Sequence, residues 1–84
     1  MTERSEFSVF QFFLDDSYER VLSFVSAERA VRMAGQLSRS VGGQIGTTKR
    51  IIITDGGDSI AFEWQFGRGV TFPSSADLTS ETSK

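Results

Sequence analysis

The chain has 84 residues, a hydrophobic fraction of 38% with eight Phe and one Trp, and a formal net charge of −2. This length predicts one domain, and the richness in large apolar residues predicts a folded one. The chain contains no Cys and no His, which excludes disulfides, zinc–thiolate sites, cysteine nucleophiles and imidazole bases.

The N-terminus, "MTERSEFSVF", has an acidic start and lacks the apolar core of a signal peptide. No apolar run approaches the ~20 residues of a membrane span. We therefore expect a cytoplasmic protein without a membrane association, and we expect residues 1–6 to be flexible.

Two strands joined as a hairpin are predicted first. The run "FSVFQFFL" (7–14) is apolar on both alternating faces, which is typical of a central strand or of one covered on both sides. The turn residues "DDS" follow, and "YERVLSFV" (18–25) has the composition of a second strand.

A helix is predicted next, from Ala27 to Val41. Ser26 occupies the N-cap position, and apolar residues recur at helical spacing up to Val41. The pair Gly42-Gly43 is expected to end this helix, because glycine readily adopts the left-handed conformation that closes one.

A second hairpin is predicted from the β-branched run "RIIIT" (50–54) and the alternating residues that follow it. The sequence "DGGD" between them has the composition of a short turn in which glycines supply positive φ. The aromatic row of the last strand is assigned to the core beneath the helix, and it comprises Phe62, Trp64 and Phe66. Whether "VTF" adds a short fifth strand, which Pro73 would end, stays an open alternative. Residues 74–84 are expected to be disordered.

Together these elements predict an α+β domain over residues 7–73, with the order β-β-α-β-β. The sheet is expected to have four mainly antiparallel strands in the order 2-1-3-4, with one helix on one face. The second apolar face of the first strand then has no cover, so either flanking segments or a second copy would cover it.

No pattern predicts a catalytic residue, a metal ligand or a cofactor-binding residue. Asp55 and Asp58 supply too few oxygen ligands for a calcium loop. The string "GGQIGTTK" (42–49) has glycines as in a phosphate-binding loop, but it follows a helix and leads into a strand, which is the reverse order. We therefore expect no enzyme and no cofactor.

Two candidate binding surfaces remain. A possible interface with a second copy or a protein partner comprises Phe10, Phe12 and Leu14. These phenylalanines also have the type of side chain that stacks bases in single-strand RNA binders, although no ribonucleoprotein-like motif accompanies them.

The second surface follows from the charge distribution. Between Arg20 and Thr54 six bases face one acid, giving +5, whereas the rest of the chain has ten acids and three bases, giving −7. A possible anion-binding set comprises Arg29, Arg32, Arg39, Lys49 and Arg50. The alternative is an ordinary solvated helix face.

The strings "DDSYERV", "FVSAERAVRMA", "GTTKRIIITDGGD", "FEW" and "GVTFP" resemble those of a group of short uncharacterised bacterial proteins with no established activity. The resemblance spans roughly residues 7–73 and implies a bacterial, cytoplasmic setting.

The first hypothesis for function is a small non-enzymatic protein that forms a homodimer or binds a protein partner through its sheet. The second is nucleic-acid or anion binding through the basic helix face.

Overall fold

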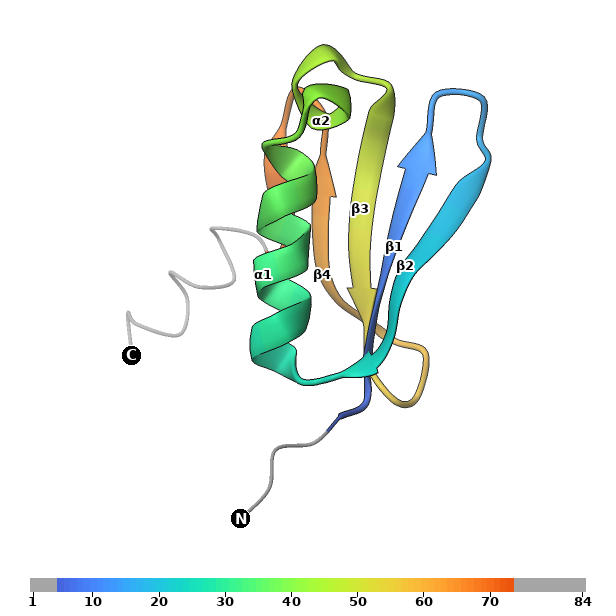
Figure 1. The fold of residues 1–84 in the computed structure, drawn as a ribbon, viewed down its shortest axis with the longest axis vertical. Coiled ribbons are helices and arrows are strands. Elements are labelled where there is room, and N and C mark those ends of the chain that lie inside the picture. Colours follow the sequence, from blue (N-terminus) through green and yellow to red (C-terminus); the bar gives the residue numbers. More distant parts are fainter. Residues whose placement is uncertain (1–4, 74–84) are drawn as a thin grey trace.

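The computed structural model describes residues 5–73, which form one sheet and two helices (Figure 1). The elements in chain order are β1 (Phe7–Phe13), β2 (Tyr18–Val25), α1 (Ala27–Ser38), α2 (Val41–Ile45), β3 (Thr48–Thr54), β4 (Ile60–Gln65) and β5 (Gly69–Phe72). The tail predicted for 74–84, and residues 1–4 of the predicted flexible start, lie outside the described residues.

The sheet has the strand order β2-β1-β3-β4-β5, and every neighbouring pair is antiparallel. The α+β class and the order 2-1-3-4 are confirmed, but the predictions of four strands and one helix are wrong. The segment after Gly67 forms the fifth strand, β5, because it pairs with β4 through three residue pairs that begin at Gln65 and Gly69. A strand of four residues is too short to have a clear periodicity of its own.

The predicted helix is shorter than expected, and a second helix follows it. The Ser26 hydroxyl accepts a hydrogen bond from the Arg29 N–H at 3.2 Å and caps α1 as expected. However, α1 ends at Ser38, and Ser40 caps α2 by accepting a hydrogen bond from the Gly43 N–H at 3.2 Å. Val41 is consequently 75% exposed and lies outside the apolar stripe of α1.

The core lies between α1 and the two central strands. Val9 and Ile51 are fully buried, and α1 presents Ala30 and Ala34 to them. The helix packs mainly on β1 and β3 and makes a smaller contact with β2. Small residues on the helix let its axis approach the bulkier Val and Ile of the sheet closely.

The aromatic row predicted for the last strand reaches the core only in part. Phe62 and Trp64 pack against the buried cluster, but Phe66 is 47% exposed. Phe66 follows the end of β4 and belongs to the turn before β5, and its N–H donates to the Lys49 carbonyl at 3.0 Å. The placement of Phe66 in the core beneath the helix is therefore wrong.

The Asp55–Asp58 segment is the connector of a hairpin, but its glycines do not supply the positive φ. Asp58 does, with φ of 65°, whereas neither Gly56 nor Gly57 is left-handed. The Asp55 Oδ1 accepts hydrogen bonds from the N–H groups of Gly57 at 2.9 Å and Ser59 at 3.0 Å. This carboxylate is thus a turn-forming group that binds the backbone of its own loop.

Candidate functional sites

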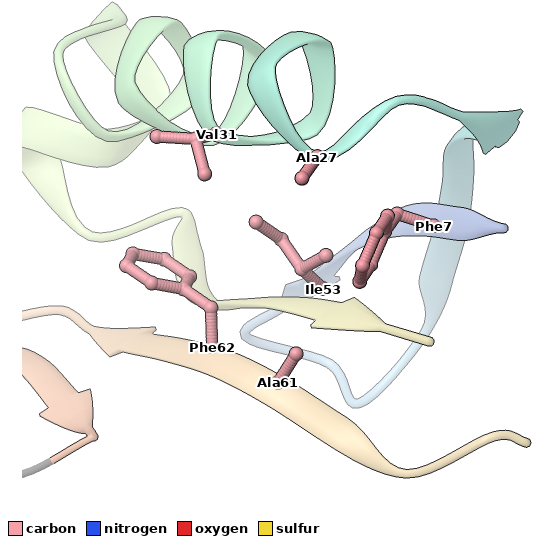
Figure 2. Close-up of a pocket in the computed structure, with 6 residues that line it drawn as sticks. All are labelled: Phe7, Ala27, Val31, Ile53, Ala61 and Phe62. Carbon is pink, nitrogen blue, oxygen red and sulfur yellow. The ribbon is translucent and has the colours of Figure 1, made fainter. Parts of the chain in front are cut away.

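The first candidate site is an apolar groove between the N-terminal half of α1 and strand β4 (Figure 2). Its volume is about 230 Å³. The lining residues are Phe7, Ala27, Val31, Ile53, Ala61 and Phe62. We refer to these six residues as the groove. All six side chains are hydrocarbon, so the groove has no group for acid–base chemistry or for metal binding.

A β-bulge shapes the floor of the groove. Ile53 pairs with Phe62, whereas the next residue, Thr54, pairs with Ile60, so Ala61 is an extra residue on β4. Extra residues of this kind bend a strand and redirect its side chains. Ala61 thereby lines the groove beside Phe62, and Val31 of α1 faces Phe62 from the other wall (Figure 2).

The groove stays open because α1 does not extend over the whole sheet. The helix packs on β1 and β3, so the helix-facing residues of β4 and β5 receive less cover. Val31 is 56% exposed and Val70 is 53% exposed. The groove therefore has an exposed apolar wall at Val31.

The second candidate site is the face of the sheet opposite α1, which we call the open face. The strand register places Phe10 and Phe12 of β1 on this face, beside Arg20 and Tyr18 of β2. The ring centroids of Phe12 and Tyr18 lie 5.5 Å apart, and those of Phe10 and Tyr18 lie 6.1 Å apart. These separations are within the range of favourable aromatic pairs.

Two arginines lie over the phenylalanine rings of the open face. The guanidinium carbon of Arg20 is 5.2 Å from the ring centroid of Phe10, and that of Arg50 is 5.1 Å from the ring centroid of Phe12. Both distances are within the ~6 Å of a cation–π contact. The hydrocarbon stems of these arginines therefore cover part of the second apolar face of β1.

Glu63 is the acidic partner on this face. Its carboxylate accepts a hydrogen bond from the Thr71 hydroxyl at 2.7 Å and forms an ion pair with the Arg50 guanidinium. Burial alone would raise the pKa of Glu63, but the hydrogen bonds from Thr71, Arg50 and Gln65 outweigh it and hold the pKa below its ordinary value of 4.5. Glu63 is thus held in its charged form.

The residues of the predicted interface do not all belong to β1, which ends at Phe13. Phe10 and Phe12 lie together on the open face and are half-buried. Leu14 lies in the turn after β1, where its N–H donates to the Thr47 carbonyl at 3.2 Å and its side chain is 65% exposed.

The predicted anion-binding residues are divided between different surfaces. Arg29 and Arg32 lie on α1, where they line a surface depression of about 380 Å³ with Met33 and Gln36. Arg32 is ion-paired with Glu28 at 3.1 Å, Lys49 is ion-paired with Asp16 near the β1–β2 turn, and Arg39 is the C-cap of α1. Arg50 lies on the open face.

Sequence reasoning missed several residues that define these sites. Tyr18 and Arg20 were assigned only to a strand, although their alternation in "YER" places them on one face. Ala61 was missed because a bulge leaves no mark in the sequence. Phe24 was missed as well: it has φ of 54° and is 67% exposed, and nothing in "LSFV" indicates this conformation.

Within residues 5–73, no three His, Cys, Asp or Glu side chains gather closely enough to hold a metal ion, and no helix is both long and apolar enough to cross a membrane. Comparison of the chain with protein-family models, with curated proteins and with solved structures finds no match.

Proposed function

We propose that this protein is a small non-enzymatic binding protein that self-associates, and that each copy inserts an aromatic side chain into the groove of the other. The observation that supports the proposal is an open, wholly apolar groove of about 230 Å³. Small-molecule sites are larger, roughly 300–1,000 Å³, and contain a few polar groups that orient the ligand. A groove of this size and chemistry suits one apolar side chain of a protein.

Phe24 is the side chain that we assign to the groove of the second copy. It is 67% exposed, and its φ of 54° is an outlier for a bulky residue. The Phe24 N–H donates to the buried Ser8 hydroxyl at 3.3 Å, which holds the backbone in this conformation. A left-handed conformation costs about 1–2 kcal/mol, and a contact made by the ring would offset that cost.

The position of Phe24 suits a reciprocal arrangement. Phe24 lies two residues before Ser26, the N-cap of α1. Ala27, the first residue of α1, lines the groove. The aromatic side chain and the groove therefore lie at the same end of α1. A two-fold axis near this end lets each copy give one ring and receive one, which is the rule for an isologous dimer.

Light scattering across a concentration series tests the proposal. We expect the wild-type mass to rise from 9.3 kDa toward twice that value. Phe24→Gly removes the ring, and glycine adopts the φ of 54° without strain. Val31→Lys places a charge at the groove. Each should weaken the dimer about 30-fold or more, the effect of losing a central contact worth ~2 kcal/mol.

The matched control is Val41→Lys, which makes the same substitution at a helical valine that is 75% exposed and outside the groove. It should leave the dimer unchanged. A wild-type protein that remains at 9.3 kDa at every concentration, or a dimer that survives both Phe24→Gly and Val31→Lys, would overturn the proposal.

A further inference from the structure

We propose that the open face binds single-stranded nucleic acid, with bases stacked on its aromatic side chains and the backbone held by its arginines. This site is separate from the groove, because the open face lies on the opposite side of the sheet from α1. The inference does not depend on self-association.

The aromatic residues of the open face have the arrangement that stacking needs. Phe10 and Phe12 alternate on the central strand β1, and Tyr18, which is 63% exposed, lies within 6.1 Å of both rings on the neighbouring strand. Single-strand binders use such rings because every base has a flat apolar surface and unpaired bases are free to turn outward. A stacked duplex does not present its bases in this way.

The charges on the open face match the same ligand. Arg20 has no ion-pair partner among residues 5–73. Its guanidinium lies over Phe10 and offers donors to a phosphate and a flat surface to a base. Arg50 lies over Phe12 but shares its charge with Glu63. The arginines therefore lie beside the aromatic residues, so phosphates and bases of one nucleic-acid strand could contact the same face.

A second copy suits this face less well than nucleic acid does. In the described part of the chain, the register puts one acid on the open face, Glu63, and it is engaged by Arg50 and Thr71. Two open faces related by a two-fold axis would therefore bring together two copies of Arg20, which has no ion-pair partner within residues 5–73. Like charges in an interface are unfavourable. The phosphates of a nucleic acid would instead neutralise Arg20.

Fluorescence anisotropy with a labelled single-stranded oligo(U) tests the inference at several salt concentrations. The wild-type protein should bind, and the logarithm of its affinity should fall with the logarithm of salt with a slope of about −0.7 for each phosphate neutralised. Arg20→Gln should make the slope shallower by about 0.7. Tyr18→Ala should weaken binding by roughly fivefold or more, whereas Tyr18→Phe should retain it.

Glu63→Gln supplies a gain that damage to the fold would not produce. It keeps an oxygen for the Thr71 hydroxyl and removes the negative charge beside Arg50, so it should tighten binding and steepen the salt slope. Arg29→Gln is the matched control for Arg20→Gln, because Arg29 lies on α1, and it should leave binding unchanged.

The inference fails if the wild-type protein does not bind oligo(U) at low salt. It also fails if inorganic polyphosphate competes fully while Tyr18→Ala has no effect, because the ligand would then be any polyanion. If Arg29→Gln and Arg20→Gln reduced the affinity for oligo(U) equally, binding would involve the helix, and the inference would likewise be overturned.

Discussion

At the scale of single residues, Glu63 determines how much positive charge the open face carries. The side chains of Glu63 and Arg50 are 16% and 33% exposed, so the pair is partly shielded from water. Such a pair is more sensitive to the loss of one partner than an exposed ion pair, because the remaining charge stays partly buried. The Arg32–Glu28 pair, at 61% and 71% exposed, contributes little by comparison.

The lowered pKa of Glu63 predicts how stability depends on pH. Because the folded protein favours the charged carboxylate, this contribution is fully present above the ordinary value of 4.5 and is lost as the pH falls through the lower folded pKa. Glu63→Gln should lower the free energy of unfolding at pH 7 by about 1–2 kcal/mol. The difference from wild type should shrink at pH 3, as measured by urea denaturation.

Thr71→Val is the companion variant for this measurement. It removes the hydroxyl that donates to Glu63 at 2.7 Å, so the pKa of Glu63 should rise. The loss of folding stability in acid should then begin at a higher pH. A difference between Glu63→Gln and wild type that is the same at pH 7 and pH 3 would contradict the assigned role of the charge.

At the scale of elements, the junction of α1 and α2 depends on one glycine. A Cβ at Gly43 would lie 2.5 Å from the carbonyl oxygens of Leu37 and Ser38, which belong to the last turn of α1. These are backbone atoms, so they cannot move aside as a flexible side chain can. The absence of a side chain at Gly43 is what lets α2 pack on the end of α1.

Gly43→Ala should therefore lower the free energy of unfolding by about 1–3 kcal/mol, the range for overpacking a close contact. The matched control is Gly57→Ala, where the new Cβ would meet the Asp55 Oδ1 at 3.6 Å and φ is not left-handed. That variant should be neutral or more stable by about 0.4–1 kcal/mol, because alanine restricts the unfolded chain. Chemical denaturation of both variants is the measurement, and an equal loss in both would contradict this account.

The elements that sequence could predict are those with a strong apolar composition or a regular periodicity. β1, β2 and β3 follow from their strand-like composition, β4 follows from alternation, and most of α1 follows from helical spacing and the cap at Ser26. The α1–α2 break was missed because Gly42-Gly43 has the composition of a helix end, and only the packing shows that Ser40 starts a new helix. The groove was beyond prediction, since it requires the bulge at Ala61 and the limited reach of α1 over the sheet.

At the scale of the whole molecule, self-association would make thermal stability depend on concentration. A partner that binds only the folded state raises the unfolding midpoint as its concentration increases. The midpoint of the wild-type protein should therefore rise with protein concentration by calorimetry. The midpoint of Phe24→Gly should not, although relief of the left-handed φ should keep that variant folded at all concentrations.

The strand order has a further consequence, for the route by which the chain folds. β1 and β2 form one local hairpin and β3 to β5 form a local meander, whereas β1 meets β3 only after the chain has passed through β2 and both helices. Contacts between segments distant in sequence are slow to form, because the intervening loop must close first. Joining the two local units at the β1–β3 seam should accordingly limit the rate. Ile52→Val, which trims a residue paired with Phe10 at this seam, should mainly slow refolding in stopped-flow measurements, whereas Gly57→Ala in the hairpin turn should leave the refolding rate nearly unchanged.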